Sequence, residues 1–150
     1  MCFESIASIF GLLLTSIGLF YTGNQIYRSR KVARAEFLLH LDEMLQEYND
    51  VHINLRPGGE WQTKSTGPKN SNEWVPVERY MGLFERINIL VNDKIVDIDT
   101  IDRLYGYRII NISNNKIINQ EKLIQEGEEW NDFINLRDKI IKKREERSHQ

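Results

Sequence analysis

SIASIFGLLLTSIGLFYTGNQIY, the stretch at residues 5–27, contains no charged side chain. A helix of about 20 predominantly apolar residues is long enough to cross the hydrocarbon core of a bilayer. The stretch is densely apolar up to Tyr21 and more polar after it. Tyr21 and Tyr27 would then lie at the membrane interface, where tyrosine is enriched. The sequence therefore predicts a transmembrane helix within residues 1–27.

Two other structures compete with this interpretation. A cleaved signal peptide begins with positive charges and ends in a small-residue cleavage site. Here Glu4 is the only charge before the stretch, and no such site precedes the cations that follow it. A buried core helix would be shorter and less uniformly apolar. The transmembrane interpretation is preferred over both.

Four cations follow the uncharged stretch and define a basic juxtamembrane segment at residues 28–35. They are Arg28, Arg30, Lys31 and Arg34. Because Lys and Arg accumulate on the cytoplasmic side of membrane proteins, we expect a single-pass protein of the cell inner membrane whose N-terminus lies outside. Residues 36–150 would then form a cytoplasmic domain, and the basic segment would contact membrane lipid.

Small residues form a stripe along the predicted span. Its members are Gly11, Thr15, Gly18 and Thr22, which recur every three or four residues and so share one helix face. Small side chains at this spacing let two helices approach closely in lipid, which predicts a homo-oligomer. Threonine hydroxyls turned inward would instead line an oligomeric pore. The third interpretation is that small residues are simply common in membrane helices.

The composition of the 150 residues limits the classes of function. The net charge is −2, so the chain lacks the basic field of a nucleic-acid binder, and a nucleic-acid polymer is not an expected partner. Cys2 is the single cysteine, which excludes an intramolecular disulfide and a cysteine-based metal site. The residues that follow the span suffice for one small domain.

Hydrophobic periodicity predicts that residues 36–150 are helical. Apolar residues from Phe37 to Leu55 repeat every three or four positions and predict an amphipathic helix. We expect it to be the central helix of a bundle, with a parallel coiled coil between protomers as the alternative. No breaker separates it from Tyr27, so span and helix can form one rod. A second helix is predicted from near Pro76 to about Asn92.

Further helices are predicted in the C-terminal half. Asp97 or Asp99 can cap a third helix, although the β-branched content of residues 108–118 leaves a strand as the alternative. In residues 119–150, Gly127 is expected to separate a short helix from a terminal one. The fold class is therefore all-α, with a single N-terminal transmembrane helix followed by a small cytosolic helical bundle of about four helices.

A long polar loop is predicted at residues 56–74. Arg56-Pro57-Gly58-Gly59 ends the preceding helix, and compact domains seldom keep so long an unstructured connection unless it is functional or disordered. An aromatic side chain and cations in such a loop can stack on and neutralise an anionic, nucleotide-like ligand. The candidate contacts to a ligand or partner are Arg56, Trp61, Lys64 and Lys69. The alternative is a solvated loop whose tryptophans pack back onto the helices.

No motif indicates an enzyme. The chain has no glycine-rich phosphate loop, no G-x-S-x-G, no H-E-x-x-H and no EF-hand loop. His40 and His52 are too far apart along one helix to form a helical pair of metal ligands. Glu78 and Glu85 are interpreted as partners in interhelical ion pairs, not as an acid–base pair. We therefore expect no catalytic residue, no metal and no cofactor.

The order of anchor, cations, amphipathic helix, loop and second helix resembles a loose family of small, uncharacterised bacterial membrane proteins. The resemblance is carried by RKVARAEFLLHLDEMLQEYNDV at residues 30–51 and by VERYMGLFERINILVNDKIVDIDTIDRLYG at residues 77–106, together about a third of the chain. It implies one N-terminal span, a cytosolic helical domain and no catalytic residues. Small anchored proteins with a cytosolic sensing domain also occur among bacterial antiphage effectors, which is an analogy of architecture.

Two functions are expected from these features. In the first, the cytosolic domain senses a protein partner or an anionic small molecule, and the anchored oligomer then perturbs the membrane in stress or antiphage defence. In the second, the protein is a passive anchor or scaffold that holds a cytosolic protein partner at the membrane.

Overall fold

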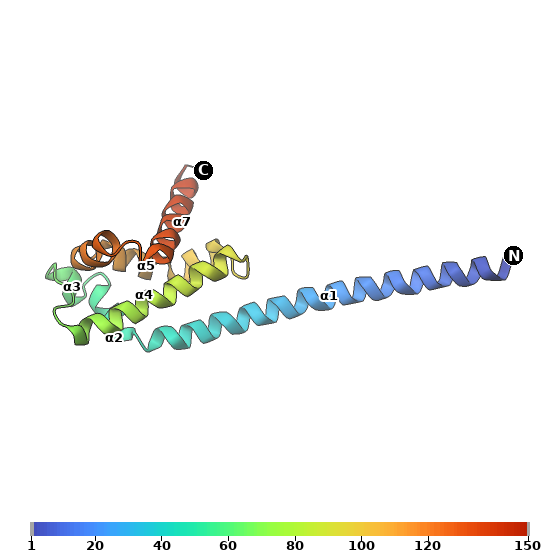
Figure 1. Cartoon of the computed structure of the whole chain (residues 1–150), viewed down its shortest axis with the longest axis horizontal. Helices are drawn as coiled ribbons and strands as arrows, with labels where there is room; N and C mark the ends of the chain where they lie inside the picture. The colour runs from blue at the N-terminus through green and yellow to red at the C-terminus, as the bar shows by residue number, and fades with distance from the viewer. Residues whose placement is uncertain (1, 150) are drawn as a thin grey trace. The chain divides into compact units, whose positions relative to one another are not determined.

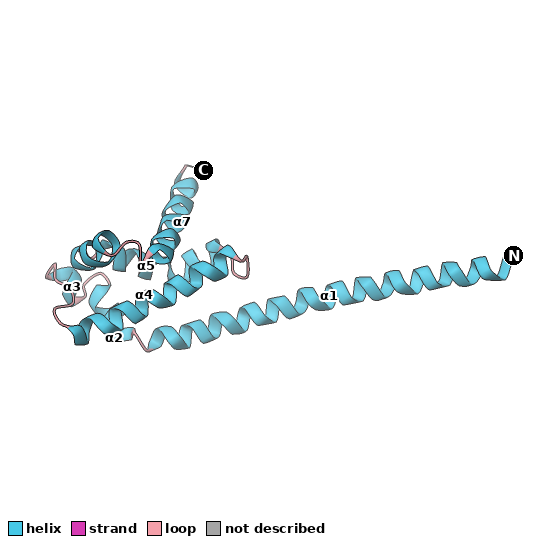
Figure 2. Ribbon diagram, viewed as in Figure 1, coloured by secondary structure: helices cyan, strands magenta, loops and turns pink. Residues whose placement is uncertain are grey.

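The computed structural model describes the backbone of residues 2–149, and the side chains of residue 15 and of residues 18–149. All regular secondary structure within residues 2–149 is helical (Figure 2). This confirms the all-α class and excludes the strand considered for residues 108–118. The chain divides into two units, Met1–Leu41 and Asp42–Gln150.

The first element, α1 (Cys2–Gln46), is one continuous helix (Figure 1). It passes through Gly23 and Asn24 without a break, and no proline or glycine follows before Gln46 to interrupt its backbone hydrogen bonds. The predicted rod is therefore confirmed as far as Gln46. Every side chain from residue 18 to residue 33 is exposed.

Among the helices within the described residues, we find none that combines the length and the apolar character needed to cross a membrane. The greater part of the predicted span, residues 1–14, 16 and 17, lies outside the residues whose side chains are described. The transmembrane helix stays a prediction from the sequence.

The prediction of one helix from Phe37 to Leu55 is wrong at its C-terminal end. Tyr48 leaves the helical conformation, with φ −106° and ψ 23°, and α2 (Asn49–Leu55) begins directly after it. The Tyr48 ring packs against Tyr80 of α4 (Ser71–Asn92), with 5.7 Å between the ring centroids. Because this contact comes from a distant part of the sequence, local periodicity does not indicate it.

Helix α4 begins one turn earlier than predicted. The Asn70 side chain accepts a hydrogen bond from the backbone N–H of Glu73 at 3.2 Å, and the Glu73 carboxylate accepts one from the backbone N–H of Lys69 at 2.8 Å. These bonds satisfy amide groups that have no partner inside the helix. Pro76 lies inside α4, and the predicted end at Asn92 is confirmed.

The cap of the third predicted helix is Asp97, whose carboxylate accepts from the Thr100 N–H at 2.7 Å. The helix it begins is α5 (Ile98–Asn114). A short α6 (Lys116–Ile118) and a π-helical segment (Asn119–Gln125) follow, where a short helix before Gly127 was predicted. Beyond the turns at residues 126–130 lies the terminal helix α7 (Asn131–Ser148).

Helices α4, α5 and α7 form the core of the Asp42–Gln150 unit, because α7 packs on both α4 and α5. Phe84 of α4 lies edge-on to Tyr80 and to Phe133 of α7, with ring centroids 5.1 and 6.3 Å apart. Other fully buried side chains of these three helices include Val77, Ile87, Ile101, Ile109, Ile112, Leu136 and Ile140. The predicted small helical bundle is confirmed for this unit.

Candidate functional site

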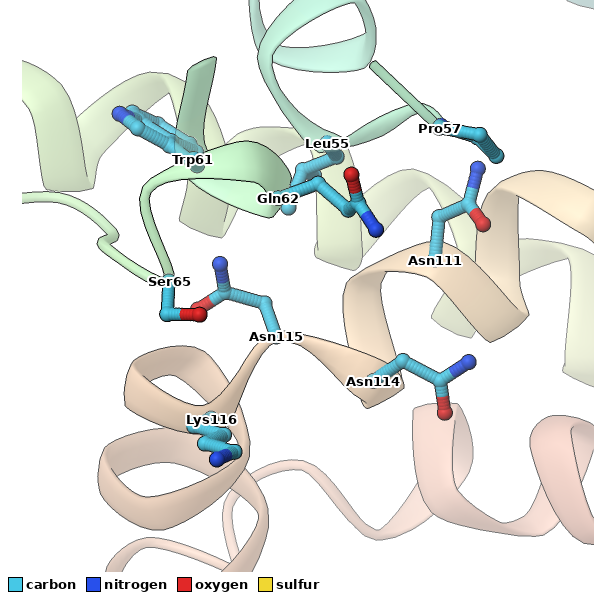
Figure 3. Close-up of a pocket in the computed structure, with 9 residues that line it drawn as sticks. All are labelled: Leu55, Pro57, Trp61, Gln62, Ser65, Asn111, Asn114, Asn115 and Lys116. Carbon is cyan, nitrogen blue, oxygen red and sulfur yellow. The ribbon is translucent and has the colours of Figure 1, made fainter. Parts of the chain in front are cut away.

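A pocket of about 260 Å³ lies in the Asp42–Gln150 unit, where residues of the predicted loop face the end of α5 and the start of α6 (Figure 3). The predicted loop is partly ordered, because it contains the short helix α3 (Glu60–Thr63). The pocket is lined by Leu55, Pro57, Trp61, Gln62, Ser65, Asn111, Asn114, Asn115 and Lys116.

One wall depends on a tight turn at the end of α2. Gly58 has φ 83°, a left-handed conformation that glycine adopts without steric cost. A Cβ at Gly59 would lie 2.2 Å from the carbonyl oxygen of Ile53, so only glycine fits there. The Gln62 side chain accepts from the Gly58 N–H at 3.2 Å and ties α3 to this turn. The turn thereby places Trp61 and Gln62 on the pocket.

Asn115 fixes the opposite wall. Its carbonyl oxygen accepts from the N–H groups of Ile117 and Ile118 at 3.2 and 3.1 Å and so caps α6. Its amide nitrogen donates to the backbone oxygen of Thr66 at 2.7 Å, across almost fifty residues of sequence. Asn115 therefore holds the two walls together, and both its side-chain oxygen and its side-chain nitrogen already take part in hydrogen bonds.

Five other lining side chains have no protein hydrogen bond or ion pair within the described residues. They are Trp61, Ser65, Asn111, Asn114 and Lys116. Trp61 and Asn111 are half-buried, whereas the other three are exposed. Ser65 has φ 52°, an uncommon conformation for a residue other than glycine. The pocket thus combines an indole, a hydroxyl, two carboxamides and one cation, all available to a ligand.

Of the four predicted contacts in the loop, the structure brings one to the pocket. Trp61 lines it, but Arg56, Lys64 and Lys69 do not. Lys64 instead pairs with Glu60 at 3.0 Å, and this hydrogen-bonded cation lowers the pKa of the Glu60 carboxyl. Both side chains are more than half exposed, so the pair contributes little to stability.

The sequence analysis missed the α5–α6 side of the pocket. Asn111 and Asn114 lie one helical turn apart, and Lys116 follows Asn115 directly. The available signal was the concentration of asparagines at residues 111–115. Trp74, the other tryptophan near the loop, is half-buried, with the Lys122 ammonium 5.0 Å from its ring centroid.

The predicted association stripe is exposed where the structure describes it. Gly18 has no neighbouring atom within 4 Å of the position of an added Cβ. The Thr22 hydroxyl donates to the Gly18 carbonyl oxygen at 2.8 Å, so its proton is directed along the helix. Thr15 is exposed, and Gly11 lies in the part of α1 whose side chains are not described.

The cations of the predicted juxtamembrane segment lie along α1. Arg28, Arg30 and Lys31 are exposed, and Arg34 is half-buried. The Lys31 ammonium lies 4.6 Å from the centroid of the Tyr27 ring, close enough for a cation–π interaction. A lysine and a tyrosine in adjacent turns are the side chains that position helix ends at a membrane interface.

Charged side chains elsewhere in the bundle connect helices. Lys122 pairs with Glu78 of α4 at 2.7 Å and with Glu126 at 2.8 Å, which confirms the interhelical role predicted for Glu78. Glu85 makes no such pair with any residue that the structure describes, and burial and then the nearby Asp132 raise the pKa of its carboxyl. We therefore assign the ion pairs of Lys122 a structural role in the bundle and no role in a ligand site.

Within the described residues, no three His, Cys, Asp or Glu side chains lie close enough together to hold a metal ion. No protein family, curated protein or solved structure matches the chain.

Proposed function

We propose that the chain is a single-pass membrane protein that self-associates through its first helix and whose helical domain receives a small ligand or a protein partner. The anchor would hold this domain at the cytoplasmic face of the inner membrane, with the cations at residues 28–35 against anionic lipid. Ligand binding would then alter how the anchored copies assemble.

The observation that carries the proposal is a group of large apolar side chains exposed on α1. They are Leu19, Phe20, Tyr21, Ile26 and Tyr27, each at least half exposed. Full burial of such a side chain stabilises by about 1.5–3 kcal/mol, so their exposure to water is unfavourable. Contiguous exposed apolar surface marks a membrane or protein interaction site. Because this group forms the end of the uncharged stretch at residues 5–27 and directly precedes the cations, lipid and a second copy of the helix are the surfaces best matched to it.

The open face at Gly18 supports association between copies. In lipid, helices associate by close packing instead of by the hydrophobic effect, and small residues allow the backbones to approach. Apart from the backbone of α1 itself, no described part of the chain lies within 4 Å of a Cβ added at Gly18. The internal hydrogen bond of Thr22 keeps its hydroxyl proton from being left unsatisfied at such an interface.

Oligomers of the span would perturb the bilayer, in the manner of small bacterial effectors of stress or antiphage defence. A passive anchor that recruits a cytosolic protein is the alternative, and the two differ in whether reconstituted vesicles leak.

A pair of matched variants tests association and leakage together. Gly18→Leu fills the association face, whereas Gly23→Leu places the same side chain on another face of α1 that also has no neighbour within 4 Å. We expect full-length protein in detergent to be oligomeric and to release ions from vesicles. Gly18→Leu should abolish both properties and Gly23→Leu should retain them. Leakage by a monomeric Gly18→Leu variant would contradict the effector role, and sealed vesicles with every protein would favour the passive anchor.

A further inference from the structure

The free groups of the pocket match one class of ligand. A carboxamide presents a donor and an acceptor side by side, which is the complement of the N6 and N7 edge of adenine. Guanine offers two acceptors at the corresponding edge and fits a carboxamide less well. Asn111 and Asn114 supply two such carboxamides, one helical turn apart at the end of α5.

The other lining residues provide for the rest of a nucleotide. Figure 3 shows Asn111 and Asn114 on one side of the pocket, with Trp61 and Ser65 on the other. The half-buried indole of Trp61 offers a face on which a base can stack. Lys116 supplies a cation for a phosphate, and none of the lining residues is acidic.

The size and charge of the pocket limit the ligand to a small one. Its volume of about 260 Å³ lies just below the range of about 300–1,000 Å³ that is usual for drug-sized ligands. A single cation lines it, whereas sites for polyphosphates gather several cations or a bound metal. Both features favour one phosphate over two or three.

From these observations we infer that the pocket binds an adenine nucleoside monophosphate. Asn111 and Asn114 recognise the base edge, Trp61 stacks on the base, and Lys116 pairs with the phosphate. The inference rests on the proposed role of the helical domain as a ligand receiver and names the ligand class. It is independent of membrane insertion, because every lining residue belongs to the Asp42–Gln150 unit.

The test is calorimetric titration of the full-length protein in detergent with AMP, GMP, adenosine and ribose 5-phosphate. We expect AMP to bind at least tenfold more tightly than each of the other three. Ribose 5-phosphate binding as tightly as AMP would overturn the inference, because the base would then contribute nothing. Equal binding of GMP, or no binding of AMP at millimolar concentration, would overturn it as well.

Single substitutions test which residue of the pocket contacts the phosphate and which contacts the base. Lys116→Gln should weaken AMP about tenfold and leave adenosine unchanged, whereas Asn114→Ala should weaken both ligands. Both residues are exposed, so neither change removes a core contact. Lys64→Gln is the matched control, since its cation pairs with Glu60 outside the pocket and its loss should leave AMP affinity within twofold.

The two proposals fail separately. Loss of AMP binding in a protein that still forms oligomers in detergent would overturn the pocket inference alone. AMP binding by a protein that neither associates nor inserts into vesicles would overturn the proposed anchor and leave the pocket assignment in place.

Discussion

Asp102 of α5 is a buried carboxylate whose two partners come from the terminal helix. Its side chain is 3% exposed, and it accepts from Arg144 at 2.7 Å and from Arg147. Removing one member of a buried ion pair leaves charge without compensation, which costs about 3–5 kcal/mol when both members are buried. Here the two arginines are nearly half exposed and can return to water.

We therefore predict that Asp102→Ala lowers the free energy of unfolding by about 2 kcal/mol, less than for a fully buried pair. The measurement is urea denaturation followed by circular dichroism. Asp99→Ala is the control, because Asp99 pairs with Lys143 at 3.5 Å with both side chains exposed, and such a pair contributes at most about 1 kcal/mol. Equal losses for the two variants would contradict the role assigned to Asp102.

His52 gives the unfolding free energy a pH dependence of known sign. Burial, and then the positive charges of Arg108 and Arg56, lower the pKa of its imidazole below the ordinary value of 6.5. The unfolded chain therefore binds the proton more readily than the folded one. Stability from this site is complete above pH 6.5 and is lost as the pH falls through the lowered pKa.

We predict that wild-type protein loses more stability between pH 7.5 and pH 5.5 than His52→Asn does. Urea denaturation at both pH values measures the difference. The raised pKa of Glu85 acts in the opposite direction but is common to both proteins, so it cancels in the comparison. Identical losses would show that His52 titrates as it does in the unfolded chain.

At the level of elements, two helical glycines differ in their surroundings: Gly106 is closely packed, whereas Gly82 is not. A Cβ at Gly106 of α5 would lie 2.3 Å from an Asp102 carboxylate oxygen and 2.7 Å from a guanidinium nitrogen of Arg144, so α5 and α7 need glycine there. Gly82 of α4 has no atom within 4 Å of such a Cβ.

The prediction is that Gly106→Ala destabilises by roughly 1–3 kcal/mol through overpacking. Gly82→Ala should stabilise by up to about 1 kcal/mol, because alanine loses less backbone entropy in a helix. Thermal denaturation of both variants in the same buffer measures the change in stability. A Gly106→Ala variant as stable as Gly82→Ala would mean that the ion pair at Asp102 shifts without cost.

Elements defined by local chemistry were predictable from the sequence, and those defined by distant contacts were not. Asp97 caps α5 through a carboxylate that reaches three residues along the chain, and such a signal can be read from the sequence. The break at Tyr48 depends on Tyr80, and the pocket depends on the bond between Asn115 and Thr66. Trp61 was predicted as a candidate site residue because its loop can be recognised from the local sequence. Asn111, Asn114 and Lys116 were missed because only tertiary contacts bring them to the same pocket.

At the scale of the whole molecule, the two units divide anchoring from recognition in our account. Exposed apolar side chains and cations lie on α1, whereas the pocket with its free polar groups belongs to the Asp42–Gln150 unit. The anchor and the pocket are independent of each other. Control of membrane assembly by a ligand, however, requires both. The proposed oligomer and its effect on the bilayer both depend on insertion of α1 into the membrane.

The most direct test of this insertion is flotation of the full-length protein with lipid vesicles after a wash in alkaline carbonate, which removes proteins held only at the membrane surface. We predict that the protein floats with the vesicles, and that replacing Leu13 by arginine leaves it at the bottom of the gradient, because a charge at the centre of a span opposes insertion. Wild-type protein released by carbonate would contradict the account and would assign the exposed apolar side chains of α1 to a protein partner.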